Sequence, residues 1–308
     1  MQNLIVLVIV GLIAQLVDGA LGMAYGATSA TLVLAAGYAP ATASASVHLA
    51  ELGTTAVSGY SHWRFGNVDW RTARRIGIPG AIGAFTGAVI LSSISADIAK
   101  PWMAGILLVL GIYILARFTI GRTPRPGGRP YVRGRYLAPL GLGAGLIDAT
   151  GGGGWGPVST PTLLATGKME PRKVVGSVDT SEFLVALAAS VGFLVGLGSQ
   201  GAKPAIVLPL LAGGVVAAPF AAWLVQLLTA RILGAAVGGL ILLTNARTMA
   251  DAFQARGEVR NPAYLAIVVV WVAAVSFVVY LHKRDGLPLT NRLPRRERSA
   301  EPATETAS

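Results

Sequence analysis

The chain has 308 residues, of which 53% are hydrophobic and only 13% are charged. Soluble domains carry about a quarter charged residues, so this composition argues strongly against a water-soluble enzyme. There is no Cys and the three His are scattered, so we expect no disulfide, no metal site and no other cofactor. The net charge of +11 does not indicate nucleic acid, because the basic residues lie in short loops between apolar runs and in the C-terminal tail.

Nine apolar segments follow one another along the chain, and most are long enough for one membrane crossing, which takes about 20 residues. They are 3–37, 41–61, 76–94, 102–119, 136–166, 173–198, 204–228, 232–249 and 262–281. Segments 3–37 and 136–166 are too long for one crossing, and each contains a Gly-rich break. The breaks run from Asp18 to Gly26 and from Asp148 to Pro157. The second contains four consecutive Gly, which do not suit a helix interior.

The two breaks are counterparts in an internal repeat. Asp18 aligns with Asp148, Tyr25 with Trp155 and Gly26 with Gly156. After one inserted residue the match continues, so that His48 aligns with Asp179 and Glu51 with Glu182. Paired interruptions at corresponding places in two halves of a membrane protein are the best sequence indication of a transporter binding site.

The distribution of Lys and Arg favours re-entrant hairpins over full crossings at the two broken segments. With hairpins, one side of the membrane receives 20 of the 25 basic residues, whereas full crossings divide them 14 to 11. Basic residues gather on the cytoplasmic side. We therefore expect an all-α polytopic membrane protein of two homologous, inverted repeats, each opening with a broken helix, with about seven to nine membrane segments.

Composition divides the chain into five regions. The first and second membrane repeats are 1–120 and 136–250, and a basic, Pro- and Gly-rich cytoplasmic linker at 121–135 joins them. An extra membrane helix at 251–284 precedes a polar tail at 285–308, which we expect to be disordered.

The glycines of the breaks are candidate anion ligands, because unpaired backbone N–H groups and the positive end of a half-helix favour negative charge. The candidate substrate-binding residues are Gly22, Gly26, Gly151, Gly152, Gly153, Gly154, Tyr25 and Trp155. Close helix packing is the alternative for the glycines, but packing does not need four in succession. The two aromatic residues either line the path or wedge the hairpins in place.

Carboxylates inside membrane segments are costly and are usually functional. We hypothesise that Glu51 and Glu182 bind a proton during transport, with purely structural hydrogen bonding as the alternative. His48 and Asp179 each stand three residues before one of these carboxylates, on the same helix face, which suggests titrating pairs; packing is the alternative for His48. Asp18 and Asp148 suit caps of the re-entrant turns.

These features resemble the TauE/SafE family of membrane permeases, also called the sulfite exporter or toluenesulfonate uptake permease family. The resemblance rests on the Asp148–Pro157 motif with Pro161-Thr162-Leu163-Leu164, on the loop His62–Arg71, and on the glycine-rich stretch from Pro79 to Gly87. It covers roughly residues 4–250. It implies transport of a sulfur-containing anion such as sulfite or an organosulfonate.

We therefore predict a multi-pass plasma-membrane permease that moves a small anion by alternating access between the repeats, with export preferred. The chain has no ATP-binding motif, so the hypothesis includes proton coupling. The rival hypotheses are a membrane-embedded enzyme that uses intramembrane carboxylates and a passive anion channel. The expected partners are the small anion and the lipid bilayer, not nucleic acid, and the sequence leaves a homo-oligomer open.

Overall fold

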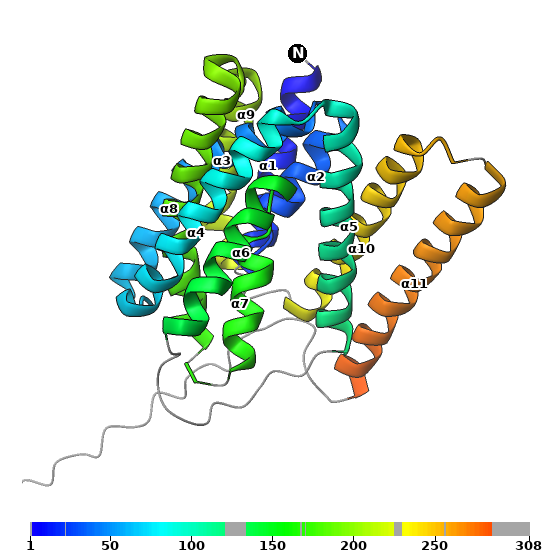
Figure 1. Cartoon of the computed structure of the whole chain (residues 1–308). Coiled ribbons are helices and arrows are strands. Elements are labelled where there is room, and N and C mark those ends of the chain that lie inside the picture. Colours follow the sequence, from blue (N-terminus) through cyan, green and yellow to red (C-terminus); the bar gives the residue numbers. More distant parts are fainter. Residues whose placement is uncertain are drawn as a thin grey trace, which may run out of the picture.

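The computed structural model describes residues 2–21, 23–120, 134–166, 168–169, 171–224, 230–255 and 257–284. Within these ranges the chain forms α-helices, one short 3-10 helix and no strand (Figure 1), which confirms the all-α fold class. Gly22, most of the linker and the tail predicted at 285–308 lie outside the described residues.

Each half of the chain has the same order of helices, a long broken one followed by three long ones. The first half contains α1 (Gln2–Leu21), α2 (Tyr25–Ala35), α3 (Pro40–Arg64), α4 (Trp70–Ser93) and α5 (Ala96–Ile120). The second contains α6 (Gly134–Gly151), α7 (Trp155–Ala165), α8 (Pro171–Leu197), η1 (Gly198–Gln200), α9 (Pro204–Leu224) and α10 (Ala230–Ala252), and α11 (Gly257–Arg284) follows it.

Four described helical segments are long and apolar enough to cross a membrane. They are Trp70–Ser93, Ala96–Ile120, Lys173–Leu197 and Arg260–Arg284. The first begins at Trp70 rather than at the predicted residue 76, because the Asp69 side chain accepts a hydrogen bond from Thr72 N at 2.7 Å and caps the helix there. Local capping therefore extends this helix beyond its apolar stretch.

Helices α6 and α7 form a hairpin, called hairpin 2 below, whose two ends lie at the same end of the bundle. Gly134, at the start of α6, lies beside Arg75 of the first turns of α4. Beyond the end of α7, Met169 accepts a hydrogen bond from Thr72, also near the start of α4. The chain thus enters the bundle along α6, turns at residues 152–154 and returns along α7.

Helices α1 and α2 form a second hairpin, called hairpin 1, which opens toward the opposite end. Figure 1 marks the N-terminus at the upper end of the bundle, whereas hairpin 2 opens at the lower end. The start of α3, which follows α2, lies close to the start of α9, because Lys203 N donates to Ser46 Oγ at 3.3 Å. The two hairpins therefore approach the centre from opposite ends.

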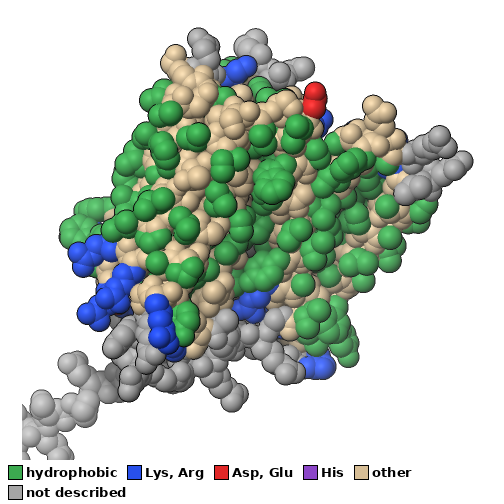
Figure 2. Space-filling view, viewed as in Figure 1, with side chains coloured by type: hydrophobic (Ala, Val, Ile, Leu, Met, Phe, Trp, Pro, Cys, Tyr) green, Lys and Arg blue, Asp and Glu red, His purple; other side chains and the backbone are tan. Residues whose placement is uncertain are grey.

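Each hairpin packs on a long helix of the other half. α1 lies against α9 and α6 against α4, while α3 and α8 pack together, as do α5 and α10. α11 contacts mainly α10 and leaves large apolar side chains exposed, among them Leu265, Val269 and Phe277. Figure 2 shows a largely hydrophobic face with Lys and Arg gathered toward the lower end of the molecule, as expected for a helical bundle surrounded by lipid.

Candidate functional site

The turns of the two hairpins touch each other in the middle of the bundle. Gly153 packs directly on the backbone of Gly26 and Ala27, so a side chain at Gly153 would overlap that backbone. Gly152 and Gly153 have φ angles of 73° and 155°, which favour glycine because they disfavour a Cβ atom. The contact between the halves therefore depends on glycine at the second break.

The first N–H groups of the half-helices point at carboxylates of their own hairpins. Asp148 Oδ1 accepts hydrogen bonds from Gly154 N at 2.6 Å and from Trp155 N at 2.9 Å. Asp18 Oδ1 accepts one, from Tyr25 N at 3.2 Å. A helix N-terminus stabilises negative charge, so any anion that binds there competes with these two side chains.

The other candidate glycines face apolar side chains. Gly151 packs on Ile106, Gly152 on Met103 and Ala30, and Gly154 on Ile147. Gly26 differs, because a Cβ atom at this position would lie 2.8 Å from Glu51 Oε1. Among these glycines, Gly26 is the one that leaves room for an ionisable group.

The candidate aromatic residues, one beside each turn, are buried. Trp155 is fully buried, and its Nε1 donates to Val178 O of α8 at 3.1 Å. Tyr25 is 4% exposed, and its hydroxyl donates to Leu210 O of α9 at 3.5 Å. Each ring therefore links the start of a short half-helix to a long helix of the bundle.

His48 of α3 forms a buried pair with Asp148 of the other half. Its Nε2 lies 3.1 Å from Asp148 Oδ2, and its Nδ1 lies 2.8 Å from the carbonyl oxygen of Ser44. Two backbone N–H groups favour the ionised form of Asp148, so both ring nitrogens face acceptors and both carry a proton. His48 is therefore the cation of a buried ion pair, and its ring contacts Asp148 rather than Glu51, the partner that helical spacing suggested.

The remaining carboxylates converge on a small polar pocket beside the meeting point of the hairpins. Its lining consists of Gln15, Asp18, Tyr25, Glu51, Thr54, Thr55, Ser58, Asp179 and Glu182. Gln15 and Asp18 come from α1, Tyr25 from α2, and the rest from α3 and α8, so both halves contribute. No Lys, Arg or His lines it, and among the described residues no three His, Asp or Glu come together as a metal site.

Several acceptors in this pocket have no hydrogen-bond partner within the described structure. They are Gln15 Oε1, Glu51 Oε1 and Asp179 Oδ2, and their residues are 6%, 2% and 8% exposed. Buried polar atoms almost always have partners. These atoms are therefore available to a proton, to water or to a ligand.

Sequence reasoning missed three residues of this region: Gln15, Ser58 and Asn245. Gln15 lies three residues before Asp18 in an otherwise apolar stretch, which was a usable signal because polar residues within membrane segments usually face the protein interior. Asn245 of α10 donates from Nδ2 to Thr31 Oγ1 of α2 at 2.9 Å. That bond joins residues far apart in the chain and had no signal in the spacing.

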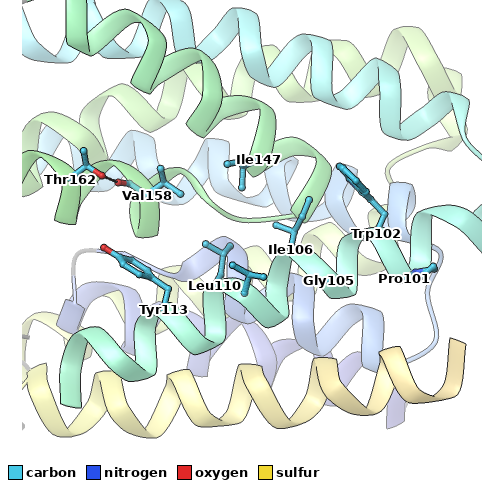
Figure 3. Close-up of a pocket in the computed structure, with 10 residues that line it drawn as sticks. Pro101, Trp102, Gly105, Ile106, Leu110, Tyr113, Ile147, Val158 and Thr162 are labelled. Atoms are coloured by element: carbon cyan, nitrogen blue, oxygen red, sulfur yellow. Dashed lines mark hydrogen bonds between the residues drawn. The ribbon is translucent and has the colours of Figure 1, made fainter. Parts of the chain in front are cut away.

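An apolar groove of about 700 Å³ lies between α5 and hairpin 2 (Figure 3). Trp102, Ile106 and Tyr113 of α5 face Ile147 of α6 and Val158 and Thr162 of α7 across it. Ile106 and Ile147 also pack on glycines of the second break. The groove therefore runs beside the turn of hairpin 2, whereas the Asn245 bond ties hairpin 1 to its neighbour α10.

Paired hairpins that meet beside a buried polar pocket have the build of a membrane transporter. The family model "Sulfite exporter TauE/SafE" matches residues 7–248, and the chain belongs to this family. This confirms the resemblance found in the sequence.

Two curated relatives from Bacillus subtilis (strain 168) carry transporter names. The chain is 51% identical to "Probable membrane transporter protein YtnM" over 280 residues, 91% of this chain and 93% of the relative. It is 30% identical to "Probable membrane transporter protein YdhB" over 204 residues, 63% of this chain and 82% of that protein. No solved structure matches the chain. The protein is a multi-pass membrane transporter rather than an enzyme.

Proposed function

We propose that this transporter moves a small anion, sulfite or an organosulfonate, out of the cell by alternating access between its two halves. The observation that carries the proposal is the contact of the two glycine-rich turns in the middle of the bundle, directly beside a pocket lined from both halves. Irregular backbone is tolerated at membrane depth only where protein or a water-filled cavity satisfies its polar groups. The family name supports sulfite as the first substrate to test.

The halves are the proposed moving units. Their helices follow the same order, and each hairpin packs on a long helix of the other half, α1 on α9 and α6 on α4. This exchange supports two inverted repeats, an arrangement in which rocking of one repeat against the other exposes a central site to each side in turn. The site lies at the tips of the hairpins, where such a motion changes the contacts most.

The anion site is the set of backbone N–H groups at the start of α2 and α7. Asp18 and Asp148 already direct carboxylate oxygens at these groups, which indicates that the positions accept negative charge. A substrate oxyanion would take over these donors when a hairpin moves. The glycines of the second break allow the backbone to come close to it.

Proton coupling follows from the charge of the pocket. Glu51, Glu182 and Asp179 line it without a basic residue among them, so an arriving anion meets repulsion unless protons neutralise the carboxylates. Binding of protons therefore favours binding of the anion. His48, held by Asp148, contributes a buried positive charge close to the turns of the hairpins.

The test is flux of sulfite, sulfoacetate and sulfate in proteoliposomes, with and without an imposed pH gradient. We expect saturable, gradient-driven flux in the parent protein and loss of gradient drive in Glu51→Gln and Glu182→Gln. The matched control is Asp251→Asn, because Asp251 is 47% exposed at the end of α10, away from the pocket.

Three results separate the rival interpretations. Flux that does not saturate and carries current identifies a channel. If the pH gradient still drives full flux in both Gln variants, these two carboxylates have a structural role only. No flux of any tested anion refutes the proposed substrate class.

A further inference from the structure

The turns of the two hairpins differ in the charge that faces their capping carboxylate. In hairpin 2, Asp148 faces the doubly protonated ring of His48 at 3.1 Å, and both side chains are buried. In hairpin 1, Asp18 faces the acidic pocket, whose lining also includes Asp179 of α8, with one carboxylate oxygen that has no hydrogen-bond partner. The sequence repeat aligns Asp18 with Asp148 and Asp179 with His48. Where one half has a cation, the other therefore has a second carboxylate.

Among the described residues, no basic side chain of a neighbouring helix lines the pocket, and His48 of α3 faces Asp148 instead. The pocket holds the carboxyl groups of Asp18, Glu51, Asp179 and Glu182 and the phenol of Tyr25. α9, which packs on α1, and α7, which packs on α8, contain no ionisable side chain. The basic residues of α10, Arg231 and Arg247, lie near its two ends. Those of α4 and α3 at the lower end are Arg71, Arg74, Arg75, Arg64 and His62, and none of them lines the pocket.

Two carboxylates that line one small pocket without a cation cannot both keep their charge at low cost. A proton shared between them removes one charge and forms a strong hydrogen bond. Asp179 Oδ2 and Gln15 Oε1 are buried acceptors without a partner, so each is open to a proton. Since no three acidic or His side chains of the described chain form a metal site, a proton fits better than a multivalent ion.

We propose that Asp18 and Asp179 share one exchangeable proton, which holds hairpin 1 to α8 as the His48 ring holds hairpin 2 to α3. Loss of this proton leaves two facing carboxylates, which repel each other and release hairpin 1. This inference rests on the proposed function in one respect, that the shared proton is the one that drives transport. It assigns the coupling step to hairpin 1 and a permanent anchor to hairpin 2.

The first experiment needs no transport. The thermal midpoint of the purified protein is measured between pH 5 and pH 8 in the parent, Asp18→Asn, Asp179→Asn and Asp179→His. A proton held only by the folded state stabilises at low pH and is lost as pH rises. We expect the midpoint of the parent to fall by about 4 °C over this range, and the fall to be at least halved in both Asn variants. The control Asp251→Asn removes an exposed carboxyl group outside the pocket. We expect its thermal midpoint to fall with pH as steeply as that of the parent.

Asp179→His is the decisive variant, because it copies the His–Asp pair of the other half. We expect its midpoint to vary less with pH than that of the parent. A parent slope that survives in both Asn variants overturns the shared proton. A thermal midpoint that is higher in Na⁺ than in choline at the same pH also overturns it, because a sodium ion then stabilises the pocket in place of the proton.

The second experiment connects the pair to transport. In proteoliposomes, Asp179→His should exchange sulfite between the two sides but lose accumulation driven by a pH gradient. Gradient-driven accumulation at the parent level contradicts the assignment of the coupling proton. If the parent moves no tested anion, the proposed function fails, while the pH slope of the thermal midpoint still decides whether the proton is shared.

Discussion

Hairpin 1 and hairpin 2 have similar shapes, yet they are held in the bundle in opposite ways. Hairpin 2 is anchored at its turn, where Asp148 pairs with His48, but an apolar groove separates α7 from α5. Hairpin 1 is anchored along its short helix, where Thr31 bonds Asn245 of α10, but its turn faces carboxylates. The duplicated hairpin is therefore a fixed part in the second half and a releasable part in the first.

The largest expected effect is at the contact between the two turns. Gly153→Ala places a methyl group in the backbone of Gly26 and Ala27, at a φ of 155°. Overlap and backbone strain together should cost about 4 kcal/mol, and little folded protein should remain. Size-exclusion chromatography of the detergent-solubilised protein measures this. Gly143→Ala is the control, because nothing lies within 4 Å of the added carbon; equal yields of the two variants would contradict the contact.

The next effect compares the two capping carboxylates. Asp148→Asn removes the charge opposite a buried His48 and should cost about 3 kcal/mol. Asp18→Asn removes one of the four carboxylates that line the pocket and keeps an acceptor for Tyr25 N, so its effect should stay within about 1 kcal/mol. Thermal unfolding of both variants at pH 7 measures the difference. Equal losses would show that the two turns are anchored alike.

A smaller effect is expected where hairpin 1 meets α10. Asn245→Ala removes the hydrogen bond to Thr31 and leaves that buried hydroxyl without this partner, which should cost about 1.5 kcal/mol. Thr244→Ala is the control on the same helix, because the Thr244 hydroxyl donates to the local carbonyl of Leu240 rather than to another helix. Hydrogen exchange of α2 should rise in the first variant alone. Unchanged exchange would place the anchor of hairpin 1 elsewhere.

The smallest effect is a gain in stability at the first turn. Ala24 has a φ of 96°, in the left-handed region that L side chains disfavour. Ala24→Gly should therefore stabilise the protein by about 1 kcal/mol. The thermal midpoint tests this against Ala36→Gly, at a position with φ −74°, which should not stabilise. A loss of stability in Ala24→Gly would refute strain at this turn.

Most of the fold could be predicted from local features of the sequence. Four consecutive glycines after Asp148 predict a break in any helix, and long apolar stretches bounded by charged residues predict the membrane helices. The described helices agree with these segments within a few residues at most ends. At the start of α4 the difference arises from the cap of Asp69, which acts beyond the apolar stretch.

The pairing of charges could not be predicted in the same way. Spacing along α3 places His48 near Glu51, but the turn of hairpin 2 brings Asp148 to the ring instead. Similarly, the pocket brings Gln15 and Ser58 together with carboxylates from three helices. Such contacts depend on how the hairpins cross the other half, and helix periodicity carries no information on that crossing.

The central claim, that the pocket beside the meeting point of the hairpins belongs to the transport site, is tested most directly by its accessibility. The chain has no Cys, so Ser58→Cys places a single thiol at the pocket, and Val216→Cys places one on the exposed apolar face of α9. Both are treated from each side of the membrane with a charged, water-soluble thiol reagent, with and without sulfoacetate, because sulfite itself attacks such reagents. We predict that Ser58→Cys is labelled from both sides and protected by sulfoacetate, while Val216→Cys is not labelled. Labelling of Ser58→Cys from one side only, with no protection, would contradict the account.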